Sequence, residues 1–257
     1  MIHFITFANK DFMDNRRITE EAKDFGLFDT INSKNEDDIK DFVEKHKNFI
    51  LNNKKGFGYY IWKSYIVLQE LYKINYDDIL VYSDAGMYIN KNGKERFLEY
   101  INYIKDEKHI CVFNTGDNYK AQYFVKQDAI MHYNPEFNST LDTMSYSGLL
   151  FIRKTDESIR LIKDWFNLCE NYKFSDKSIS TKYQEKNYYR GNDCDNGLLC
   201  LVLSKYKDII HYIYPDEVNI YYNGLQVKHT SKKNDEIPWN LLDKIPFQYR
   251  RIRPDYY

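Results

Sequence analysis

One short apolar segment that ends in a carboxylate constrains this chain more than any other feature. Ile79–Ser83 is rich in apolar residues, and Asp84, Ala85 and Gly86 follow it directly. A run of this kind, bounded by polar residues, predicts a strand buried on both faces of a sheet. Ligands bind beyond the carboxyl ends of such strands in open α/β sheets, so we expect a metal ion or a sugar nucleotide near Asp84. The alternative is a carboxylate that caps a helix or closes a turn.

Strand-like and helix-like segments alternate along the chain. The spacing of apolar residues predicts strands at 2–8, 79–83, 110–113, 149–152 and 209–214, and helices at 36–51, 61–73, 93–105, 158–171 and 195–206. This alternation predicts an α/β fold with a mainly parallel central sheet and helices on both faces. No repeat, low-complexity tract or linker divides the sequence. We therefore expect a single domain over residues 1–257, with an irregular last quarter.

The composition narrows the function classes. The net charge is −1 and no basic block occurs, which argues against nucleic-acid binding. No apolar stretch approaches the ~18 residues of a transmembrane helix, and the N-terminus lacks the basic lead of a signal peptide. The cysteines, Cys111, Cys169, Cys194 and Cys200, show no Cys-x-x-Cys spacing. They predict reduced, mostly buried thiols rather than a zinc site, and with the absent signals they favour a cytoplasmic location.

The segment 54–63 joins two glycines, several aromatic residues and lysines ahead of a predicted helix. Glycines permit close approach of the backbone to a ligand, and lysines bind phosphate as point charges. The spacing matches neither a P-loop nor a Rossmann fingerprint. A loop whose aromatic residues belong to the core is the alternative.

Two later segments carry further candidate groups. Asp193 and Asp195 stand at the start of a predicted helix. One of them is expected to cap the helix, and the other is then free to face a cleft as a base or as an acceptor for a substrate hydroxyl. His229 lies beyond the last predicted strand and is followed by Lys232. Imidazole suits Mn²⁺ beside a carboxylate, and a lysine could neutralise a diphosphate; a solvated loop histidine is the alternative.

Taken in order, these segments resemble a known family. Segments 56–63 and 82–86 resemble the pattern Gly-x-Gly-Tyr-x-x-Trp-Lys-Pro, then Tyr-x-Asp-Ala-Gly, of glycosyltransferases from capsule and surface-polysaccharide clusters and from large DNA viruses. Segment 145–155 resembles the strand that precedes a helix with a central tryptophan, here Trp165. Segment 195–199 stands where the family has Asp-Gln-Ser before an apolar helix. The blocks match in order over about residues 1–235.

The resemblance implies a single GT-A-like, Rossmann-like domain. Its donor-binding half would cover about residues 1–115 and its acceptor-side half about 116–235. The implied activity is transfer of a hexose from a nucleotide-diphosphate sugar to a saccharide or another hydroxyl acceptor, as in polysaccharide biosynthesis.

The resemblance also implies roles for individual residues. Asp84 would stand in for the Asp-x-Asp motif and, with His229, hold Mn²⁺ or Mg²⁺ on the donor diphosphate. Asp195 would serve the acceptor side, as a general base if the enzyme inverts or as a stabiliser of positive charge if it retains. Further contacts to the donor would come from Asn9, Arg16, Tyr60, Trp62, Lys63, Ala85, Gly86 and Lys232.

The chain departs from the family pattern in three places. Ser64 replaces the proline, Gly86 stands where an Asp-x-Asp motif has its second carboxylate, and before the apolar helix Asn192-Asp193 and Asn196-Gly197 replace His-Arg and Gln-Ser. The missing carboxylate keeps open a catalytically inactive module that binds a sugar or nucleotide sugar on the same fold. A nucleotidyltransferase would need a further carboxylate cluster or a glycine-rich phosphate loop, and the sequence shows neither.

Overall fold

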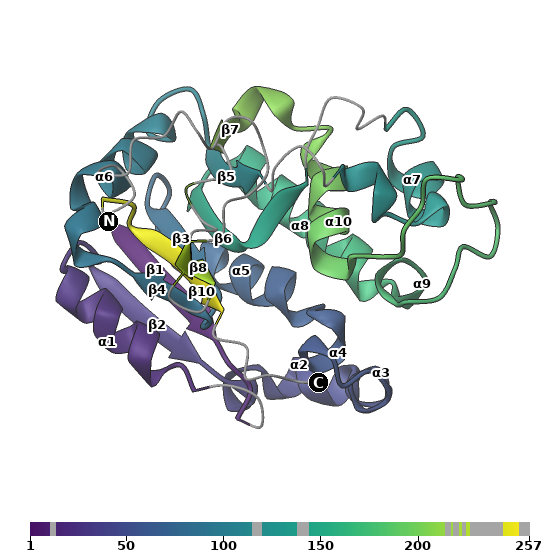
Figure 1. Cartoon of the computed structure of the whole chain (residues 1–257), viewed down its shortest axis with the longest axis horizontal. Helices are drawn as coiled ribbons and strands as arrows, with labels where there is room; N and C mark the ends of the chain where they lie inside the picture. Colours follow the sequence, from purple (N-terminus) through teal and green to yellow (C-terminus); the bar gives the residue numbers. More distant parts are fainter. Residues whose placement is uncertain are drawn as a thin grey trace.

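A computed structural model describes residues 1–10, 14–114, 120–137, 144–213, 217, 221–222, 225–226 and 244–251. In this part of the chain the central sheet has the strand order β2-β1-β3-β6-β5-β7, and a smaller sheet has the order β4-β10-β8-β9 (Figure 1). The strands are β1 (Ile2–Phe7), β2 (Thr30–Lys34), β3 (Ile79–Ser83), β4 (Met87–Ile89), β5 (Ile110–Asn114), β6 (Ser145–Arg153), β7 (Ile210–Ile213), β8 (Tyr221–Tyr222), β9 (Leu225–Gln226) and β10 (Phe247–Arg251).

The central sheet is mainly parallel, as the sequence predicts. β1 pairs in parallel with β2 and β3, and β5 pairs in parallel with β7. β6 is antiparallel to both of its neighbours, β3 and β5. Its first residues therefore lie at the same edge of the sheet as the carboxyl end of β3, where Ser83 faces Leu149.

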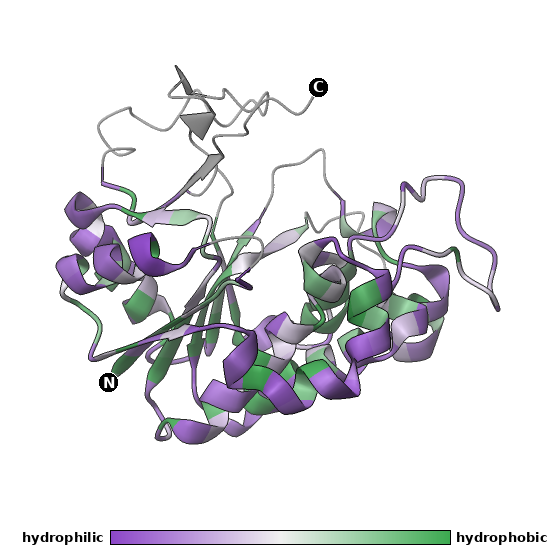
Figure 2. Ribbon diagram, turned by 90° about the horizontal axis from the view of Figure 1, so that it is seen from below, coloured by the Kyte–Doolittle hydropathy of each residue, from purple (hydrophilic) through white to green (hydrophobic). Residues whose placement is uncertain are grey.

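Helices cover both faces of this sheet (Figures 1 and 2). They are α1 (Arg16–Phe25), α2 (Lys40–Lys45), α3 (Lys47–Asn52), α4 (Gly56–Tyr59), α5 (Trp62–Lys73), α6 (Lys94–Tyr103), α7 (Gln127–Tyr133), α8 (Asp156–Glu170), α9 (Tyr172–Ser175) and α10 (Cys194–Leu203). Short 3₁₀ turns occur at Glu36–Ile39, Lys91–Gly93, Ala121–Tyr123 and Lys207–Ile209.

The strands divide their side chains between two hydrophobic cores. Along β3, Leu80 and Tyr82 join a core with α5, α8 and α10, whereas Ile79 and Val81 join a second core with α1 and α6. This alternation follows from the period of two along a strand. Figure 2 shows hydrophobic residues on the strands and on the helix surfaces next to them. The sheet is thus buried on both faces, which confirms the α/β architecture.

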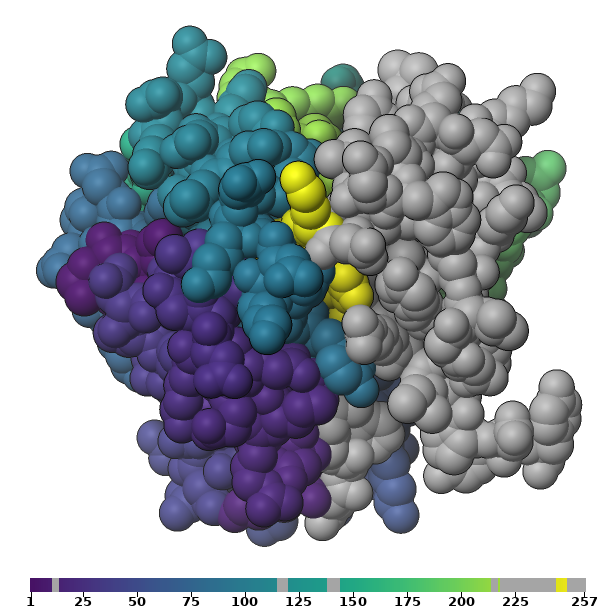
Figure 3. Space-filling view, turned by 60° about the vertical axis from the view of Figure 1, so that its left-hand side comes forward, coloured from purple at the N-terminus to yellow at the C-terminus, as the bar shows by residue number. Residues whose placement is uncertain are grey.

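The smaller sheet joins segments that are far apart in the sequence. β10 pairs antiparallel with β4, and Asn90 donates its backbone N–H to the carbonyl of Pro246 at 2.8 Å. Figure 3 shows the late segment, in yellow, against the teal surface of the earlier one. A Cβ on Gly93 would lie 2.4 Å from the backbone of Pro246, so only glycine fits there. The turn after β4 is therefore closed by the C-terminal part of the chain.

The prediction of one helix over 36–51 is wrong. A 3₁₀ turn, α2 and α3 occupy this region, and the helices break at His46, where φ is −105° and ψ is 12°. The ring of His46 is buried and its Nδ1 lies 2.5 Å from the hydroxyl of Tyr172. This contact with α9 is a tertiary interaction that helical spacing does not encode. The helices α1 and α7 and the strand β2 also lack a counterpart among the predicted elements.

The structure bears on the expectations that no helix spans a membrane and that the cysteines are reduced and buried. In the described ranges no helix is long and apolar enough to cross a lipid bilayer. All four cysteines are buried and carry free thiols, as predicted.

We expect Phe151→Ala to destabilise the fold strongly. Its ring is fully buried and lies 5.4 to 6.0 Å, between ring centroids, from those of Phe97, Tyr100, Phe113 and Phe247. Truncation of a buried phenylalanine costs about 3–5 kcal/mol of unfolding free energy. Urea unfolding measures this loss. Leu98→Ala, at a side chain that is 44% exposed, is the control and should change stability by less than about 0.5 kcal/mol; equal effects of the two variants would contradict the described core.

Candidate active site

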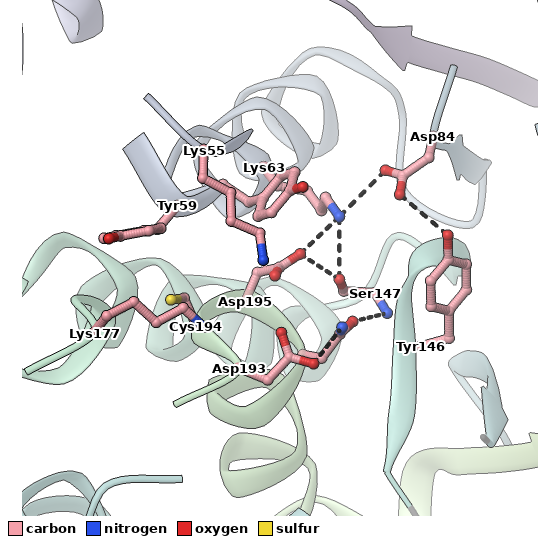
Figure 4. A pocket seen from close by; sticks show the side chains of 12 residues that line it. Lys55, Tyr59, Lys63, Asp84, Tyr146, Ser147, Lys177, Asp193, Cys194 and Asp195 are labelled. Carbon is pink, nitrogen blue, oxygen red and sulfur yellow. Dashed lines mark hydrogen bonds and ion pairs between the residues drawn. The ribbon is translucent and has the colours of Figure 1, made fainter. Parts of the chain in front are cut away.

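Four chain segments meet at the carboxyl edge of the central sheet. They are the residue after β3, the start of β6, the start of α5 and the start of α10. The segments bring together Asp84, Tyr146, Ser147, Lys63 and Asp195, which line one pocket of about 260 Å³. Figure 4 shows their side chains pointing toward one another. The position of this pocket agrees with the general rule that ligands bind outside the carboxyl ends of the strands.

The ammonium group of Lys63 lies at the centre of this site. Its Nζ is 2.7 Å from Oδ2 of Asp195, 3.2 Å from Oδ1 of Asp84 and 3.1 Å from Oγ of Ser147 (Figure 4). Ser147 also donates its hydroxyl to Asp195 at 2.6 Å. The side chains of Lys63 and Asp195 are only 3% and 4% exposed. One buried cation therefore ties two carboxylates that lie far apart in the sequence.

The surroundings keep Lys63 charged. Burial by itself would lower the pKa of the ammonium, but the charges of Asp195 and Asp84 outweigh it and raise the pKa above its usual value. Burial has the opposite effect on the neighbouring phenol of Tyr82. There burial first, and then the charge of Asp84, raise the pKa and keep the phenol protonated. Tyr82 is thus a stable hydrogen-bond donor at this edge of the sheet.

Asp84 is held in place from three sides. Tyr82 donates its hydroxyl to Oδ1 at 2.6 Å, and Tyr146 donates to Oδ2 at 3.3 Å. The backbone N–H of Asp84 donates to the carbonyl of Gly148 at 2.8 Å. A Cβ on Gly148 would lie 2.3 Å from the ring of Tyr146 and 2.5 Å from Oδ2 of Asp84. The glycine therefore makes the space that the carboxylate occupies.

An irregularity in β6 aims Ser147 into the site. Val112 of β5 faces Leu150, but the next residue, Phe113, faces Tyr146. The residues of β6 between these two partners bulge out of the ladder, and Ser147 is one of them. Bulges of this kind re-aim side chains and are common next to active sites.

The start of α10 supplies two carboxylates with different surroundings. Asp195 is paired with Lys63, and its carbonyl accepts a hydrogen bond of 3.1 Å from the indole of Trp165 on α8. Asp193 stands at the N-cap position without a side-chain cap, and its carboxylate accepts instead from the amide of Asn196 at 3.1 Å. Burial, and then the charge of Asp195, raise the pKa of Asp193. Neither carboxylate is consumed by capping, and both line the pocket.

A left-handed turn precedes Lys63. Residues 56–60 all have positive φ, between 53° and 84°. For residues other than glycine this conformation costs roughly 1–2 kcal/mol each, so Gly56 and Gly58 reduce the strain while Phe57, Tyr59 and Tyr60 bear it. The indole of Trp62 donates to the carbonyl of Gly56 at 2.9 Å and clamps the turn. The turn presents Tyr59 and Tyr60 to the pocket.

Two more lysines line the pocket. Lys55 comes from the segment before the left-handed turn, and Lys177 comes from the segment between α9 and α10. Nζ of Lys177 donates to the carbonyl of Asn192 and lies 5.9 Å from the ring of Tyr59. In Figure 4 both lysines lie on the side of the pocket opposite Asp84. Lys55 and Lys177 are exposed, whereas Lys63 is buried between Asp84 and Asp195, so Lys55 and Lys177 lie nearer to the rim of the pocket.

The structure brings together some of the residues that the sequence indicates and separates others. Tyr60, Lys63, Asp84 and Asp195 line one pocket. Trp62 lies beneath the turn, 4.1 Å from the ring of Phe7 between centroids, and does not line the pocket. Arg16 is 88% exposed and pairs with Asp14. Three of the predicted donor contacts lie next to strand ends but do not line the pocket, namely Asn9, Ala85 and Gly86. Two further predicted residues lie outside the described part of the chain, namely His229 and Lys232.

Arg17, which the sequence does not single out, supports the segment after Asp84. Its guanidinium donates to the carbonyls of Ala85 and Met87, both at 2.8 Å, and pairs with Glu21 at 2.9 Å. The one sequence signal is its spacing of four residues from Glu21. Ser147, Tyr146 and Lys177 are likewise not indicated by the sequence as site residues, because they approach the site only in the folded chain, whereas Lys55 belongs to the segment 54–63 whose lysines the sequence indicates for phosphate binding.

The residues present are compatible with a divalent cation beside Asp84. Mg²⁺ is commonly bound through one or two carboxylates together with the phosphates of a substrate. Lys63 and Tyr82 engage Oδ1 of Asp84, whereas Oδ2 receives the longer bond from Tyr146. Among the described residues there is no cluster of three or more His, Cys, Asp or Glu side chains suited to a metal. A cation here would thus depend on Asp84, the substrate and residues beyond those described.

The fold is similar to solved structures, although no protein-family model and no curated protein sequence matches the chain. A glycosyltransferase involved in glycosylation of the major capsid of PBCV-1 matches with a TM-score of 0.50 and 11% identity, over 96% of this chain and 92% of that one. Mouse xyloside xylosyltransferase 1 matches with a TM-score of 0.48 and 10% identity, over 96% of both chains. A 4-diphosphocytidyl-2C-methyl-D-erythritol synthase from Anaerococcus prevotii matches with a TM-score of 0.40 and 11% identity, over 91% and 94%. At 11% identity the likeness to the PBCV-1 glycosyltransferase concerns the fold alone, and it confirms the expected GT-A-like fold.

We expect Lys63→Met to destabilise the protein by about 3–5 kcal/mol, because it leaves buried Asp195 without its counter-charge. Chemical denaturation of the unliganded protein measures the change. Lys40→Met, at a side chain that is 74% exposed, is the matched control and should be nearly neutral.

The double variant Lys63→Met/Asp195→Asn gives the sharper comparison. Because it removes both charges, it should be less destabilised than Lys63→Met alone. A double variant that loses at least the sum of the two single losses would contradict a charge pair at the centre of the site.

Proposed function

We propose that this protein is a glycosyltransferase that moves a hexose from a nucleotide-diphosphate sugar to a hydroxyl of a saccharide or another acceptor. The observation that carries the proposal is the union of Asp84, Lys63 and Asp195 in one pocket at the carboxyl edge of a GT-A-like sheet. The pocket holds lysines near its rim and carboxylates at its centre. A donor sugar with its diphosphate requires this combination of cations and hydrogen-bond acceptors.

The lysines would stabilise the leaving diphosphate. When the bond between the anomeric carbon and the diphosphate oxygen breaks, negative charge grows on that oxygen. Lys55 and Lys177 line the pocket and would place positive charge there, which lowers the barrier because it is positioned beforehand. A Mn²⁺ or Mg²⁺ ion held by Asp84, together with His229, would supply further Lewis-acid stabilisation of the same oxygen. Lys232, which lies outside the described residues, would add positive charge beside the diphosphate.

The two carboxylates at the start of α10, those of Asp193 and Asp195, suit different tasks. Asp195 is neutralised by Lys63 and is buried. It would fix the ammonium and stabilise positive charge on the anomeric carbon. Burial raises the pKa of Asp193, which suits this carboxylate to accept a proton. We propose that the acceptor oxygen attacks the anomeric carbon while its proton passes to Asp193, so that the new glycosidic bond replaces the bond to the diphosphate.

A second candidate function is a catalytically inactive module that binds the nucleotide sugar. The observation that favours it is the single carboxylate at Asp84, where glycine follows two residues later. Such a module would bind a donor and never release free sugar or diphosphate. The first experiment below separates the two by measuring binding and turnover on the same samples.

We expect one nucleotide sugar in a donor panel to raise the melting temperature. At a donor concentration of about 100 times Kd, mass action adds about 2.7 kcal/mol, which corresponds to roughly 5–10 °C for a domain of this size. The shift should be larger with Mn²⁺ than with EDTA and should be lost in Asp84→Ala. Released sugar, measured in parallel, identifies an enzyme, whereas a shift without release identifies the inactive module.

Asp106→Ala is the control for the donor panel, because Asp106 is exposed at the other end of β5. It should behave as the wild type does. Absence of a shift with every donor in the wild type would contradict the proposed function altogether. A melting-temperature shift of equal size in EDTA would be consistent with the proposed function and would show that donor binding does not require the metal.

The activity should fall as pH decreases through the pKa of Asp193, because protonation removes the proton acceptor. Since that pKa is raised, the fall should begin above the range of an ordinary aspartate, which is ~4. Asp193→Asn should lower kcat by about 10²–10⁴-fold and abolish this acidic limb. The measurement is kcat/KM against pH for both proteins; an unchanged limb in Asp193→Asn would show that another group takes the proton.

A further inference from the structure

The segment between α9 and α10 meets the pocket near both of its ends, where Lys177 and Asp193 line it. The backbone N–H of Asp193 donates to the carbonyl of Phe124 at 2.9 Å, and that of Arg190 donates to the carbonyl of Tyr123 at 2.7 Å. Asp193 lines the pocket, and Arg190 is three residues before it. In Figure 1 the segment lies beside α7 and α9, on the side of the molecule away from α1. A substrate that extends out of the pocket along this side would meet Arg190.

The acidic groups near this segment face inward and hold it. Asp128, which is 8% exposed, accepts the backbone N–H groups of Thr181, Lys182 and Tyr183 at 2.8 to 3.1 Å. Burial opposes ionisation of Asp128, but these bonds outweigh it and lower its pKa. Glu185 accepts from the backbone N–H groups of Gln127 and Ser180 at 3.0 and 2.9 Å. Asp176 pairs with the buried Lys126.

The cations of the same segment remain at the surface. Lys182, Lys186 and Arg190 are exposed. Because the nearby acids are engaged with the backbone or with Lys126, these cations give the rim a positive surface. The segment thus separates its charges, with carboxylates turned inward and cations turned outward.

Arg190 belongs to a group that we call the rim cluster, formed by Tyr123, Tyr188 and Arg190. The guanidinium of Arg190 lies 4.6 Å from the ring centroid of Tyr123, and the rings of Tyr123 and Tyr188 are 5.8 Å apart. Tyr188 is 40% exposed. Tyrosine offers an apolar face and a hydroxyl to a sugar ring, and a guanidinium held against a ring is pre-organised to bind carboxylate or phosphate with two parallel hydrogen bonds.

We propose that the rim cluster is an acceptor subsite for an acidic glycan, whose carboxylate or phosphate groups bind Arg190 while a neighbouring sugar ring packs on Tyr188. This inference rests on the proposed function, since it names the acceptor class for the same pocket. Asp84, Asp193 and Asp195 outnumber the buried Lys63 at the centre of the site, so a charged acceptor would place its neutral hydroxyl there and its anionic group at the rim. The separation between the pocket carboxylates and the basic rim fits such a substrate.

The test compares three oligosaccharide-like probes by calorimetric titration at low salt. Hexagalacturonate carries carboxylates, a six-unit glycerol phosphate oligomer carries phosphates, and maltohexaose is neutral. At least one anionic probe should bind about tenfold more tightly than maltohexaose. Arg190→Gln should weaken that binding about tenfold, equal to about 1.4 kcal/mol, and Tyr188→Ala should also weaken it. If only one anionic probe binds, the result identifies carboxylate or phosphate as the group that Arg190 recognises. If both bind, negative charge itself is the determinant.

The matched control is Lys40→Gln, which removes an exposed cation from α2 and should leave the binding of each probe unchanged. Melting temperatures of the unliganded variants report whether each variant is folded. The inference is overturned if maltohexaose binds as tightly as both anionic probes, or if Arg190→Gln binds them as the wild type does. A donor-induced shift in the melting temperature of the wild type tests the proposed function separately. Failure of the acceptor subsite can therefore be distinguished from failure of the glycosyltransferase function.

Discussion

The buried ammonium of Lys63 is the interaction on which the rest of the site depends. A lone charge removed from water is costly unless opposite charges and hydrogen bonds surround it. Lys63 meets that condition only because Asp195, 132 residues later in the chain, and Asp84 both reach it. The positions of β3, β6, α5 and α10 are thus linked through one cation. Any substrate that enters the pocket meets carboxylates whose orientation is already fixed.

The strained turn before α5 supports this arrangement. The left-handed residues 56–60 deliver the chain to α5 so that Lys63 stands in its first turn and points inward. The clamp from Trp62 to Gly56 stabilises the turn from below. Backbone strain that is retained in a folded protein tends to lie at functional sites. The aromatic residues of this segment therefore divide their tasks: Trp62 maintains the backbone, and Tyr59 and Tyr60 form the wall of the pocket.

The sequence predicts the buried strands well, because long apolar runs leave few alternatives for a chain segment. It places Asp84 at the end of β3 and Asp195 at the start of α10, as the structure has them. It does not predict α1, whose buried residues Ile18, Ala22 and Phe25 form a sparse pattern among charges. The resemblance indicates Arg16, which is 88% exposed, whereas Arg17 is the arginine that contacts the segment after Asp84. The contacts of Ser147 depend on a bulge in β6, and a bulge follows from pairing between strands rather than from local spacing.

The pairing of β4 with β10 determines when the chain can finish folding. The amide of Asn90, next to β4, donates to the carbonyl of Ile245, a partner 155 residues further along the chain. On a ribosome that adds about 5–20 residues per second, β4 waits roughly 8–30 s for that partner. The segment after Asp84 leads directly into β4, so Arg17 can hold it early, whereas the pairing with β10 comes only when that strand has been made. A nascent chain can therefore form β1, β2 and β3 of its central sheet before β10 adds its support to the segment that follows Asp84.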